Sequence, residues 1–253
     1  MKGPEKRVDL MGCPVDALTM EETLERVEAL IAEGTPHQHM CVNAAKVDQM
    51  AHDPELRAAV RESALISADG VGVLIAGRIL GVPLPERVTG IELMARLIER
   101  AAEKGWRPYF LGARPKVVEA CVEHFRALHP NLEVAGYHHG YFDASEEEAL
   151  VQGIRDTRSD LLFVALGTPQ KEVFQHRWLP VLGIPFSMGV GGSFDVFAGR
   201  TPRSPAWARD RGLEWAWRLA HEPRRLWRRN FVENTRFLLR VARARVFGYR
   251  LPE

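Results

Sequence analysis

Cysteine is scarce in this chain, with three residues in 253. Cys13, Cys41 and Cys121 are odd in number, lie far apart and have none of the spacings typical of a zinc site. We therefore expect reduced thiols in a cytosolic protein rather than a disulfide framework. Long apolar runs are also missing, because no stretch approaches the roughly 18 to 20 residues that cross a bilayer. Residues 1–9 are charged and lack an apolar core, so we expect no secretion signal.

Several enzyme signatures are missing as well. There is no GxxxxGK[ST] element, which argues against a P-loop kinase, and no Gly-x-Ser-x-Gly elbow, which argues against an α/β-hydrolase. The Asp-x-Asp motif, the usual divalent-metal site of glycosyltransferases, is also missing. His138 and His139 are adjacent, but we expect polar strand or loop residues there rather than metal ligands. The sequence therefore predicts no metal and no other cofactor.

Lysine is absent from the last 54 residues, although this segment is strongly basic. Residues 200–253 carry fourteen arginines and five acids, a net charge of +9, whereas residues 1–199 hold 20 basic and 28 acidic residues, a net charge of −8. The total of +1 therefore hides two parts of opposite sign. An acidic body with a basic, tryptophan-containing tail indicates that the tail binds an anionic partner, such as substrate phosphates, an anionic bilayer or nucleic acid.

Short apolar runs alternate with helical stretches along the body. Strands are expected at residues 8–12, 39–42, 64–68, 107–111, 133–135, 161–166 and 185–190. Helices are expected at residues 20–33, 44–50, 54 onward, 90–104 and 115 onward. The apolar runs do not show period two, which is typical of strands buried on both faces. The sequence therefore predicts an α/β fold with a Rossmann-like open, mostly parallel sheet and helices on both faces.

Four of the expected strands end in glycine-containing turns. These turns lie at residues 69–70, 112–115, 167–169 and 191–192. Ligands of open parallel sheets bind beyond the carboxyl ends of the strands. Glycines there let backbone N–H groups approach a phosphate, and a following helix N-terminus adds positive potential.

Three of these turns carry side chains suited to chemistry. Asp69 ends a strand beside a glycine and would act as a general base toward a bound hydroxyl, or else as a helix cap. The turn at 189–195 resembles a phosphate-cradling loop with Asp195 available to a ribose hydroxyl, although a simple tight turn is equally consistent with it. Gln170 and Lys171 would reach a diphosphate, unless they only form a solvated helix start.

The tail begins with a linker-like stretch at 199–205, resumes helical patterning at 206 and breaks at Pro223. A long helix is then expected from about 224 to 247. One face of it carries Trp227, Phe231, Leu238 and Ala242. Another face carries Arg229, Arg236, Arg240 and Arg243. This pattern is typical of a basic amphipathic helix. We therefore expect an α/β catalytic domain at 1–199 and an arginine-rich helical appendage at 200–253.

Taken together, the motifs from about Val8 to Arg229 resemble those of the bacterial WecG/TagA/CpsF glycosyltransferase family. The matching pieces are Asn43, Ala68-Asp-Gly-Val-Gly72, Glu86-Arg-Val-Thr-Gly90, Phe110-Leu-Gly-Ala-Arg-Pro115, Gly167-Thr-Pro169 with Glu172, residues 189–199, Gly212-Leu-Glu-Trp215, Arg218 and Glu222-Pro-Arg-Arg225. Each piece is weak by itself, but their order and spacing are specific.

The resemblance implies an inverting, metal-independent transferase. It would move an N-acetylhexosamine-type sugar, such as N-acetylmannosamine, from a UDP-sugar to an undecaprenyl-diphosphate-linked N-acetylglucosamine during cell-surface polysaccharide or teichoic acid synthesis. The family's aspartate base falls on Asp69 and a catalytic arginine on Arg87. The tail would close the active site and meet the inner face of the cell membrane, so that the protein is cytoplasmic and peripherally membrane-associated.

The turns, the arginines and the resemblance together give the expected substrate-binding set. It comprises Asn43, Cys41, Gly112, Arg114, Gly167, Gln170, Lys171, Gly191, Gly192, Asp195, Arg203, Arg218, Arg225 and Arg228. Two positions depart from the family pattern, since Cys41 stands where Thr is frequent and Lys171 where Gln is common. These departures leave the identity of the donor sugar open.

Two other readings of the tail remain. It would serve a nucleic-acid-binding protein, or it would pack on the acidic body of a neighbouring subunit in a homo-oligomer. The apolar face with Trp227 and Phe231 favours a lipid or a domain groove over nucleic acid. We therefore expect a UDP-sugar, a polyprenyl-diphosphate-linked acceptor and an anionic membrane surface as partners, and no nucleic acid.

Overall fold

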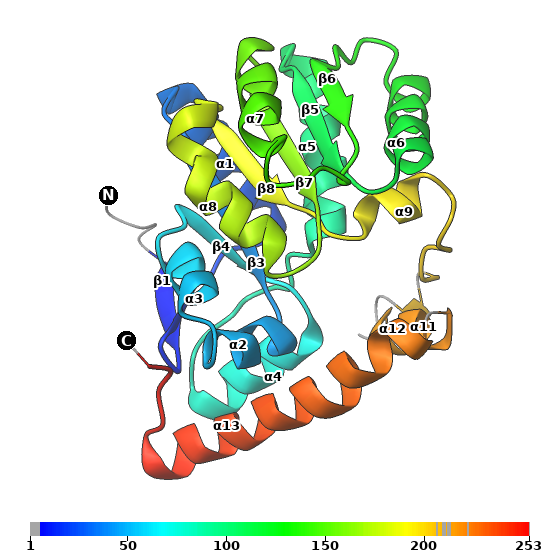
Figure 1. Ribbon diagram of the computed structural model, residues 1–253. Helices are drawn as coiled ribbons and strands as arrows, with labels where there is room; N and C mark the ends of the chain where they lie inside the picture. The colour runs from blue at the N-terminus through cyan, green and yellow to red at the C-terminus, as the bar shows by residue number, and fades with distance from the viewer. Residues whose placement is uncertain (1–5, 206, 209–210, 212–213, 222, 253) are drawn as a thin grey trace.

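The computed structural model describes residues 6–205, 207–208, 211, 214–221 and 223–252 (Figure 1). Its centre is a six-stranded sheet in which every neighbouring pair is parallel. The strands in spatial order are β4 (Leu65–Ala68), β3 (His37–Val42), β8 (Phe186–Gly189), β7 (Leu161–Ala165), β5 (Pro108–Gly112) and β6 (Gly136–His138). The predicted open α/β fold is confirmed, although β6 begins three residues after the expected start.

The helices of the body are α1 (Met20–Glu33), α2 (Ala44–Met50), α3 (Pro54–Arg61), α4 (Val71–Leu80), α5 (Gly90–Lys104), α6 (Pro115–Leu128), α7 (Glu147–Asp156), α8 (Gln170–Leu182) and α9 (Ser193–Phe197). Local chemistry fixes several of their starts. Thr19 and Glu22 form a capping box at α1, Asp53 caps α3 ahead of Pro54, and Thr89 caps α5. A hairpin of β1 (Arg7–Leu10) and β2 (Cys13–Asp16) precedes α1.

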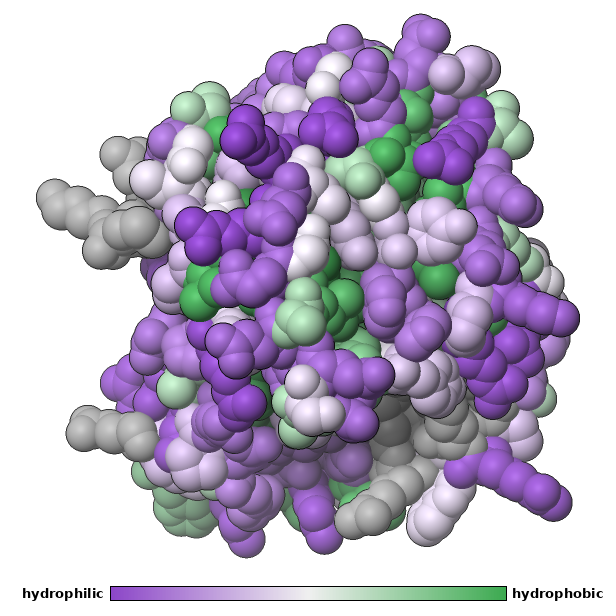
Figure 2. Space-filling model, turned by 45° about the horizontal axis from the view of Figure 1, so that its top comes forward, coloured by the Kyte–Doolittle hydropathy of each residue, from purple (hydrophilic) through white to green (hydrophobic). Residues whose placement is uncertain are grey.

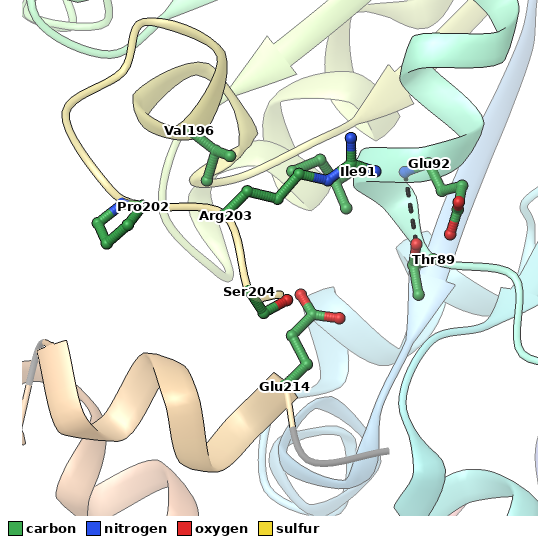
Figure 3. A pocket seen from close by; sticks show the side chains of 8 residues that line it. All are labelled: Thr89, Ile91, Glu92, Val196, Pro202, Arg203, Ser204 and Glu214. Carbon is green, nitrogen blue, oxygen red and sulfur yellow. Dashed lines mark hydrogen bonds between the residues drawn. The ribbon is translucent and has the colours of Figure 1, made fainter. Parts of the chain in front are cut away.

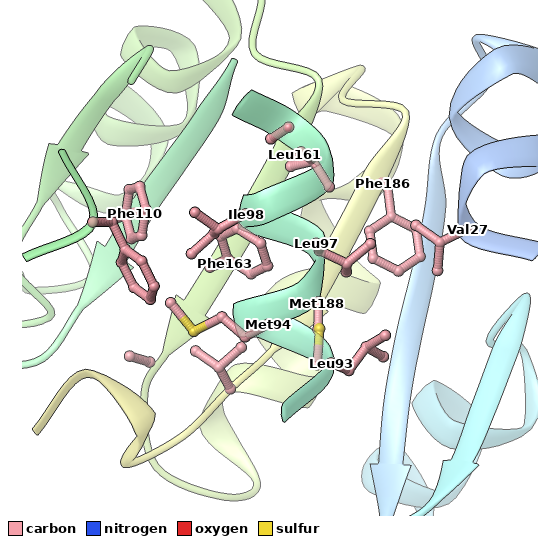
Figure 4. Packing of buried hydrophobic residues seen from close by; sticks show 14 of the residues in the cluster. Val27, Leu93, Met94, Leu97, Ile98, Phe110, Leu161, Phe163, Phe186 and Met188 are labelled. Carbon is pink, nitrogen blue, oxygen red and sulfur yellow. The ribbon is translucent and has the colours of Figure 1, made fainter. Parts of the chain in front are cut away.

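Side chains of the sheet alternate between two buried faces. Phe110 and Phe163 belong to a core cluster with α1, α5 and α6, whereas Leu162 belongs to a cluster with α7 and α8. Figure 4 shows the first cluster, with Leu97 of α5 facing Phe186 and Val27 of α1 beyond it. Helices on both faces bury every residue of the long strands, which is why the apolar runs lack period two.

The tail contains α11 (Glu214–His221), α12 (Pro223–Trp227), a π-helical segment η1 (Arg228–Glu233) and α13 (Asn234–Phe247). The last three follow one another directly, so the helix expected from about 224 to 247 is present, with a π segment inside it. A π turn holds about one more residue than an α turn, so it rotates the faces of the helix that follows it. Trp227, Phe231 and Leu238, three members of the predicted apolar face, are at least half exposed. The side chains of α13 that face the core are Phe237 and Val241, both buried.

Helix α13 crosses beneath α2 and α4 (Figure 1). Phe237 and Val241 join a core cluster with residues of α2, α3, α4 and the β1–β2 hairpin. The chain then returns to this hairpin, where the Leu251 N–H donates to the Met11 carbonyl oxygen at 2.7 Å. The end of the tail is thus part of a core that the body also builds.

A polar link also joins α13 to the body. The Arg240 guanidinium donates to an Asp48 carboxylate oxygen at 2.8 Å and to the Tyr249 hydroxyl at 2.5 Å. Burial by itself lowers the pKa of Arg240, but the hydrogen bond to Asp48 and the contacts with Tyr249 outweigh it and raise the pKa. This arginine, predicted to lie on a basic face of the helix, instead anchors the helix to α2.

The surface seen in Figure 2 is mainly hydrophilic, with hydrophobic side chains in small separate groups. In the described part of the chain, none of the helices combines the length and the apolar character needed to span a bilayer.

Candidate active site

A cavity of about 550 Å³ lies at the carboxyl ends of β3, β4, β7 and β8. The strand that follows β3 in the sequence, β4, pairs with one edge of β3, whereas β8 pairs with the other edge. A parallel sheet opens at such a reversal of strand order, and ligands of α/β proteins bind there. The tail forms the opposite wall, through Glu214, Trp215, Phe231 and Leu238.

The structure brings most of the predicted site residues of the body together around this cavity. Those that line it are Cys41, Asn43, Asp69, Arg87, Gly167, Lys171, Gly191 and Gly192. They come from five separate segments, and their meeting follows from the parallel sheet, which places strand ends at one edge.

The other predicted residues do not line this cavity. Gln170 is the exposed first residue of α8, Arg114 is the exposed N-cap of α6, and Asp195 lies in α9, which packs on α6. Gly112 has a φ of 127°, and a Cβ there would lie 2.5 Å from the Ala165 carbonyl oxygen, so close packing already requires glycine. The side chains of Arg218, Arg225 and Arg228 lie outside the described part of the molecule.

Arg203 lines a much smaller cavity beside the main one. Figure 3 shows its side chain extending toward the N-terminus of α5, where Thr89 accepts a hydrogen bond from the Glu92 N–H at 3.4 Å. Thr89, Ile91 and Glu214 line both cavities. Residues 202–204 therefore lie next to the residues that the two cavities share.

Asp69 occupies the turn between β4 and α4. Its backbone N–H donates to the Val42 carbonyl oxygen at 2.7 Å, and its side chain is half-buried in the wall of the cavity. The N-cap of α4 is Gly70, with a φ of 110°, so Asp69 does not occupy the capping position. Burial first, and then the charge of Asp69, raise the pKa of the Cys41 thiol far above its ordinary value. Cys41 is therefore a neutral group in this cavity.

Two helix N-termini add positive potential to the site. Helix α4 begins after Gly70, and helix α8 begins after Pro169; within the described chain neither start has a side-chain cap hydrogen bond. Gly70, Val71 and Gly72 line the cavity, as does Lys171 in the first turn of α8. Helix starts of this kind favour bound anions.

A buried ionic cluster lies in the cavity wall between α2 and α8. The Glu172 carboxylate oxygen Oε1 lies 2.8 Å from the Lys46 Nζ and 2.7 Å from the Lys171 Nζ, and it accepts from the Thr168 hydroxyl at 3.2 Å. Burial raises the pKa of Glu172, but the two ammonium groups outweigh it and bring the pKa to about 2. Glu172 is therefore ionised at neutral pH.

Lysine 171 shows the opposite balance. Burial first, and the neighbouring Lys46 charge second, lower its pKa to about 8, although Glu172 acts in the other direction. The pKa of Lys171 falls because one carboxylate cannot compensate two buried ammonium groups.

The sequence analysis did not place Lys46 and Glu214 in the site, nor the apolar side chains of Trp215, Phe231 and Leu238 that line the cavity. Lys46 could have been noticed in the sequence, because it stands in the first turn of an expected helix. A cation there is disfavoured by the helix dipole, so its presence indicates a role other than stabilising the helix. Glu214 could have been noticed as well, as an acid in a strongly basic segment. It opens α11 and its carboxylate lies 3.5 Å from the Arg87 guanidinium.

The chain is similar to known proteins over the segments that build the sheet and the cavity. The sequence profile of the glycosyl transferase WecG/TagA/CpsF family matches residues 8–251. A protein of Bacillus spizizenii is 34% identical over 177 residues, which cover 70% of this chain and 68% of the relative. A protein of Staphylococcus aureus is 31% identical over 245 residues, which cover 94% and 93%. Both relatives are named N-acetylglucosaminyldiphosphoundecaprenol N-acetyl-beta-D-mannosaminyltransferase.

Proposed function

The chain belongs to the WecG/TagA/CpsF family of glycosyl transferases, and we propose that this enzyme moves an N-acetylhexosamine-type sugar, N-acetylmannosamine or a relative, from a UDP-sugar to a polyprenyl-diphosphate-linked N-acetylglucosamine. The names of the two relatives support the acceptor and the type of sugar. The observation that carries the proposal is the cavity at the strand ends, in which a carboxylate, an arginine and two helix N-termini meet.

Asp69 would act as the general base. Its carboxylate would take the proton of the acceptor hydroxyl while that oxygen attacks C1 of the donor sugar. The bond between C1 and the phosphate oxygen breaks, and UDP leaves with the electron pair. A single displacement of this kind inverts the configuration at C1 and needs one carboxylate, whereas retention through a covalent intermediate needs a second one as nucleophile.

Cationic groups would stabilise the departing diphosphate. Arg87 lines the cavity, and the N-termini of α4 and α8 point positive potential into it. Fixed charges in a site that excludes water act more strongly as negative charge develops on the leaving group. We propose that Arg203 and the tail arginines Arg218, Arg225 and Arg228 add to this set, so that the reaction does not depend on a metal ion.

The remaining predicted residues would hold the rest of the donor. Asn43, Cys41, Gly167, Lys171, Gly191 and Gly192 would contact it in the cavity. Gly112, Arg114, Gln170 and Asp195 would extend the site along the same sheet edge. Asp195 would bind a ribose hydroxyl, since a carboxylate beyond a glycine-rich turn suits that contact.

The tail at 200–253 would close the site and hold the enzyme at the membrane. Trp227, Phe231 and Leu238 are at least half exposed, although large apolar side chains are usually covered. We propose that they enter the interface of an anionic leaflet, to which nearby arginines would each add attraction on the order of 1 kcal/mol. The enzyme would then be peripheral to the inner face of the cell membrane, close to its lipid-linked acceptor.

A transfer assay tests the activity. The protein is incubated with a panel of UDP-sugars and a short-chain polyprenyl-diphosphate-N-acetylglucosamine, and the product mass is measured. We expect the mass of the acceptor to rise by one N-acetylhexosamine unit with a single preferred donor. No product with any UDP-sugar, from protein that is folded by circular dichroism, would refute the proposal. Flotation with phosphatidylglycerol vesicles tests the membrane contact separately.

A further inference from the structure

Two buried lysines in the cavity wall share one carboxylate. Lys46 comes from the first turn of α2 and Lys171 from the first turn of α8, and both contact the same oxygen of Glu172. The side chains of Lys46 and Lys171 are 5% and 9% exposed, and that of Glu172 is fully buried. With both lysines protonated, this trio carries one excess positive charge.

In the described part of the chain, the other hydrogen-bond acceptors of the two lysines are neutral groups. Lys46 donates to the Cys41 carbonyl oxygen at 2.5 Å, and Lys171 donates to the Thr168 hydroxyl, both of which are neutral acceptors. The Cys41 thiol is neutral as well. Two carboxylates line the cavity beside the two lysines: Glu214 contacts Arg87, and Asp69 lies in the β4–α4 turn, where its charge acts on the same Cys41 thiol as the charges of the trio.

The fold holds these two lysines although their charged form is destabilised there. Each ammonium group lies near the positive end of a helix dipole and is largely removed from water, and both effects disfavour its charge. A Cβ at residue 189 would lie 3.2 Å from the Lys171 Cδ, so glycine at the end of β8 leaves room for the lysine stem. Both lysines line the cavity rather than the surface of the protein.

We propose that Lys46 and Lys171 form a subsite for an anionic oxygen group of the donor, and that Glu172 is the positioning residue that holds the two ammonium groups together. The inference rests on the proposed use of a nucleotide sugar. Two parts of such a donor offer the required chemistry, namely a phosphate of the diphosphate and a carboxylate on the transferred sugar. Either one would restore charge balance, because it would give two buried lysines two anionic partners.

This role predicts an unusual combination of effects. Replacing either lysine by a neutral residue of similar length leaves one lysine opposite Glu172, which is a balanced pair. Lys46→Met and Lys171→Gln should therefore fold with unchanged or higher thermal stability while losing anion affinity. A purely structural role predicts the reverse, with stability lost and affinity kept. Glu172→Gln should lower stability, since it leaves two buried ammonium groups without a counter-charge.

Calorimetric titration of the full chain separates the outcomes. The wild type, Lys46→Met and Lys171→Gln are titrated with uridine, UDP, UDP-N-acetylglucosamine and the uronic-acid form of that sugar nucleotide, in which C6 is a carboxylate. Lys104→Met is the matched control, because Lys104 is exposed and pairs with Glu28 away from the cavity. Its affinities should equal those of the wild type.

If the subsite takes a phosphate, both cavity variants should bind UDP about tenfold to a hundredfold more weakly, as expected for lost charge-assisted hydrogen bonds, with uridine binding unchanged. If it takes a sugar carboxylate, UDP binding should stay constant and only the uronic-acid nucleotide should bind more weakly. Cavity variants that bind all four probes like the wild type, or that no longer fold, would overturn the subsite. A wild type that binds none of the uridine nucleotides would overturn the proposed donor itself.

Discussion

The two walls of the cavity are built in different ways. In the wall made by the strand ends, Lys46, Lys171 and Glu172 meet at 2.7 to 2.8 Å and are almost fully buried. In the wall made by the tail, Glu214 lies 3.5 Å from Arg87 of the body, with side chains 16% and 19% exposed, and large apolar groups face solvent. The first wall is set by the core of the fold, whereas the second rests on looser and more solvated contacts. In the function proposed above, the first wall would hold the reacting groups in place and the second would adjust to the bound substrates.

The comparison predicts that changes in the sheet-side wall have the largest effect on chemistry. Asp69→Asn keeps the shape of the side chain but removes the proton acceptor, so turnover should fall by at least about 10²-fold. Donor affinity should change much less, because the substitution leaves the cavity in place. The measurement is kcat and KM with the preferred UDP-sugar. Near-normal turnover by folded protein would remove Asp69 from the role of base.

The anchor of the tail should show its effect mainly in stability. Arg240→Ala removes charge-assisted hydrogen bonds to Asp48 and Tyr249, and the free energy of unfolding should fall by about 1 to 3 kcal/mol. Arg243→Ala is the matched control, since Arg243 is exposed on the same helix. Urea denaturation of the two variants gives the difference. Equal stabilities would mean that the polar link to α2 contributes nothing to the docking of α13.

Deprotonation of Lys171 should change thermal stability and anion affinity in opposite directions as the pH rises. Its pKa of about 8 lies below the ordinary 10.5, so above pH 8 the unfolded chain binds more protons than the folded one. Thermal stability without ligand should therefore rise between about pH 8 and 10.5, through this residue. Affinity for the anionic probe that the subsite takes should fall several-fold over the same range as the positive charge is lost.

Lys171→Gln serves as the reference for this profile. The charged groups that face Lys171 are Lys46 on α2 and Glu172 on α8, and the Cys41 thiol on β3 stays neutral. The variant should lose the rise in stability and most of the fall in affinity between about pH 8 and 10.5. A wild type and a variant with parallel profiles would assign the titration to another group.

The smallest effect is expected at the contact between the walls. Glu214→Gln keeps the size of the side chain but weakens its hold on Arg87, so a diphosphate would no longer compete with a carboxylate for this guanidinium. We expect UDP affinity to rise about twofold to threefold, in keeping with a partly exposed pair worth less than about 1 kcal/mol. A loss of affinity instead would show that Glu214 orients Arg87 for binding rather than competing with the ligand.

Local signals in the sequence were sufficient for much of the fold. Thr19, Pro54 and Thr89 mark helix starts through capping chemistry, and the buried strands are visible as apolar runs. Helix α4 was not predicted, because Gly72 and Gly77 weaken its helical pattern and its apolar residues run around the helix. The π segment was not predicted either, since it depends on how the tail docks on α2 and α4.

The site was predictable where a residue follows a strand. Asp69, Gly167 and Gly191 all stand just beyond strand ends, and Lys171 stands in the first turn of the helix that follows one of them; a parallel sheet brings such positions to one edge. The contact of Lys46 with Glu172 joins residues more than a hundred positions apart, and no local pattern encodes their distance. Gly112 shows that a local motif can have a structural cause. Its motif suggested a ligand contact, but the close approach of the Ala165 backbone already requires a glycine at this position.

The clasp between Leu251 and the β1–β2 hairpin has a consequence for the segment that precedes it. Residues 199–233 are tied to the body at both ends, by α9 on one side and by α13 with its clasp on the other. In the proposed closure, a wall attached at both ends would keep a high effective concentration at the cavity and would lose little entropy on closing. Substrate exchange would then require only a short displacement of this segment, and a chain cut near residue 248 would loosen its second attachment without removing any group that lines the cavity.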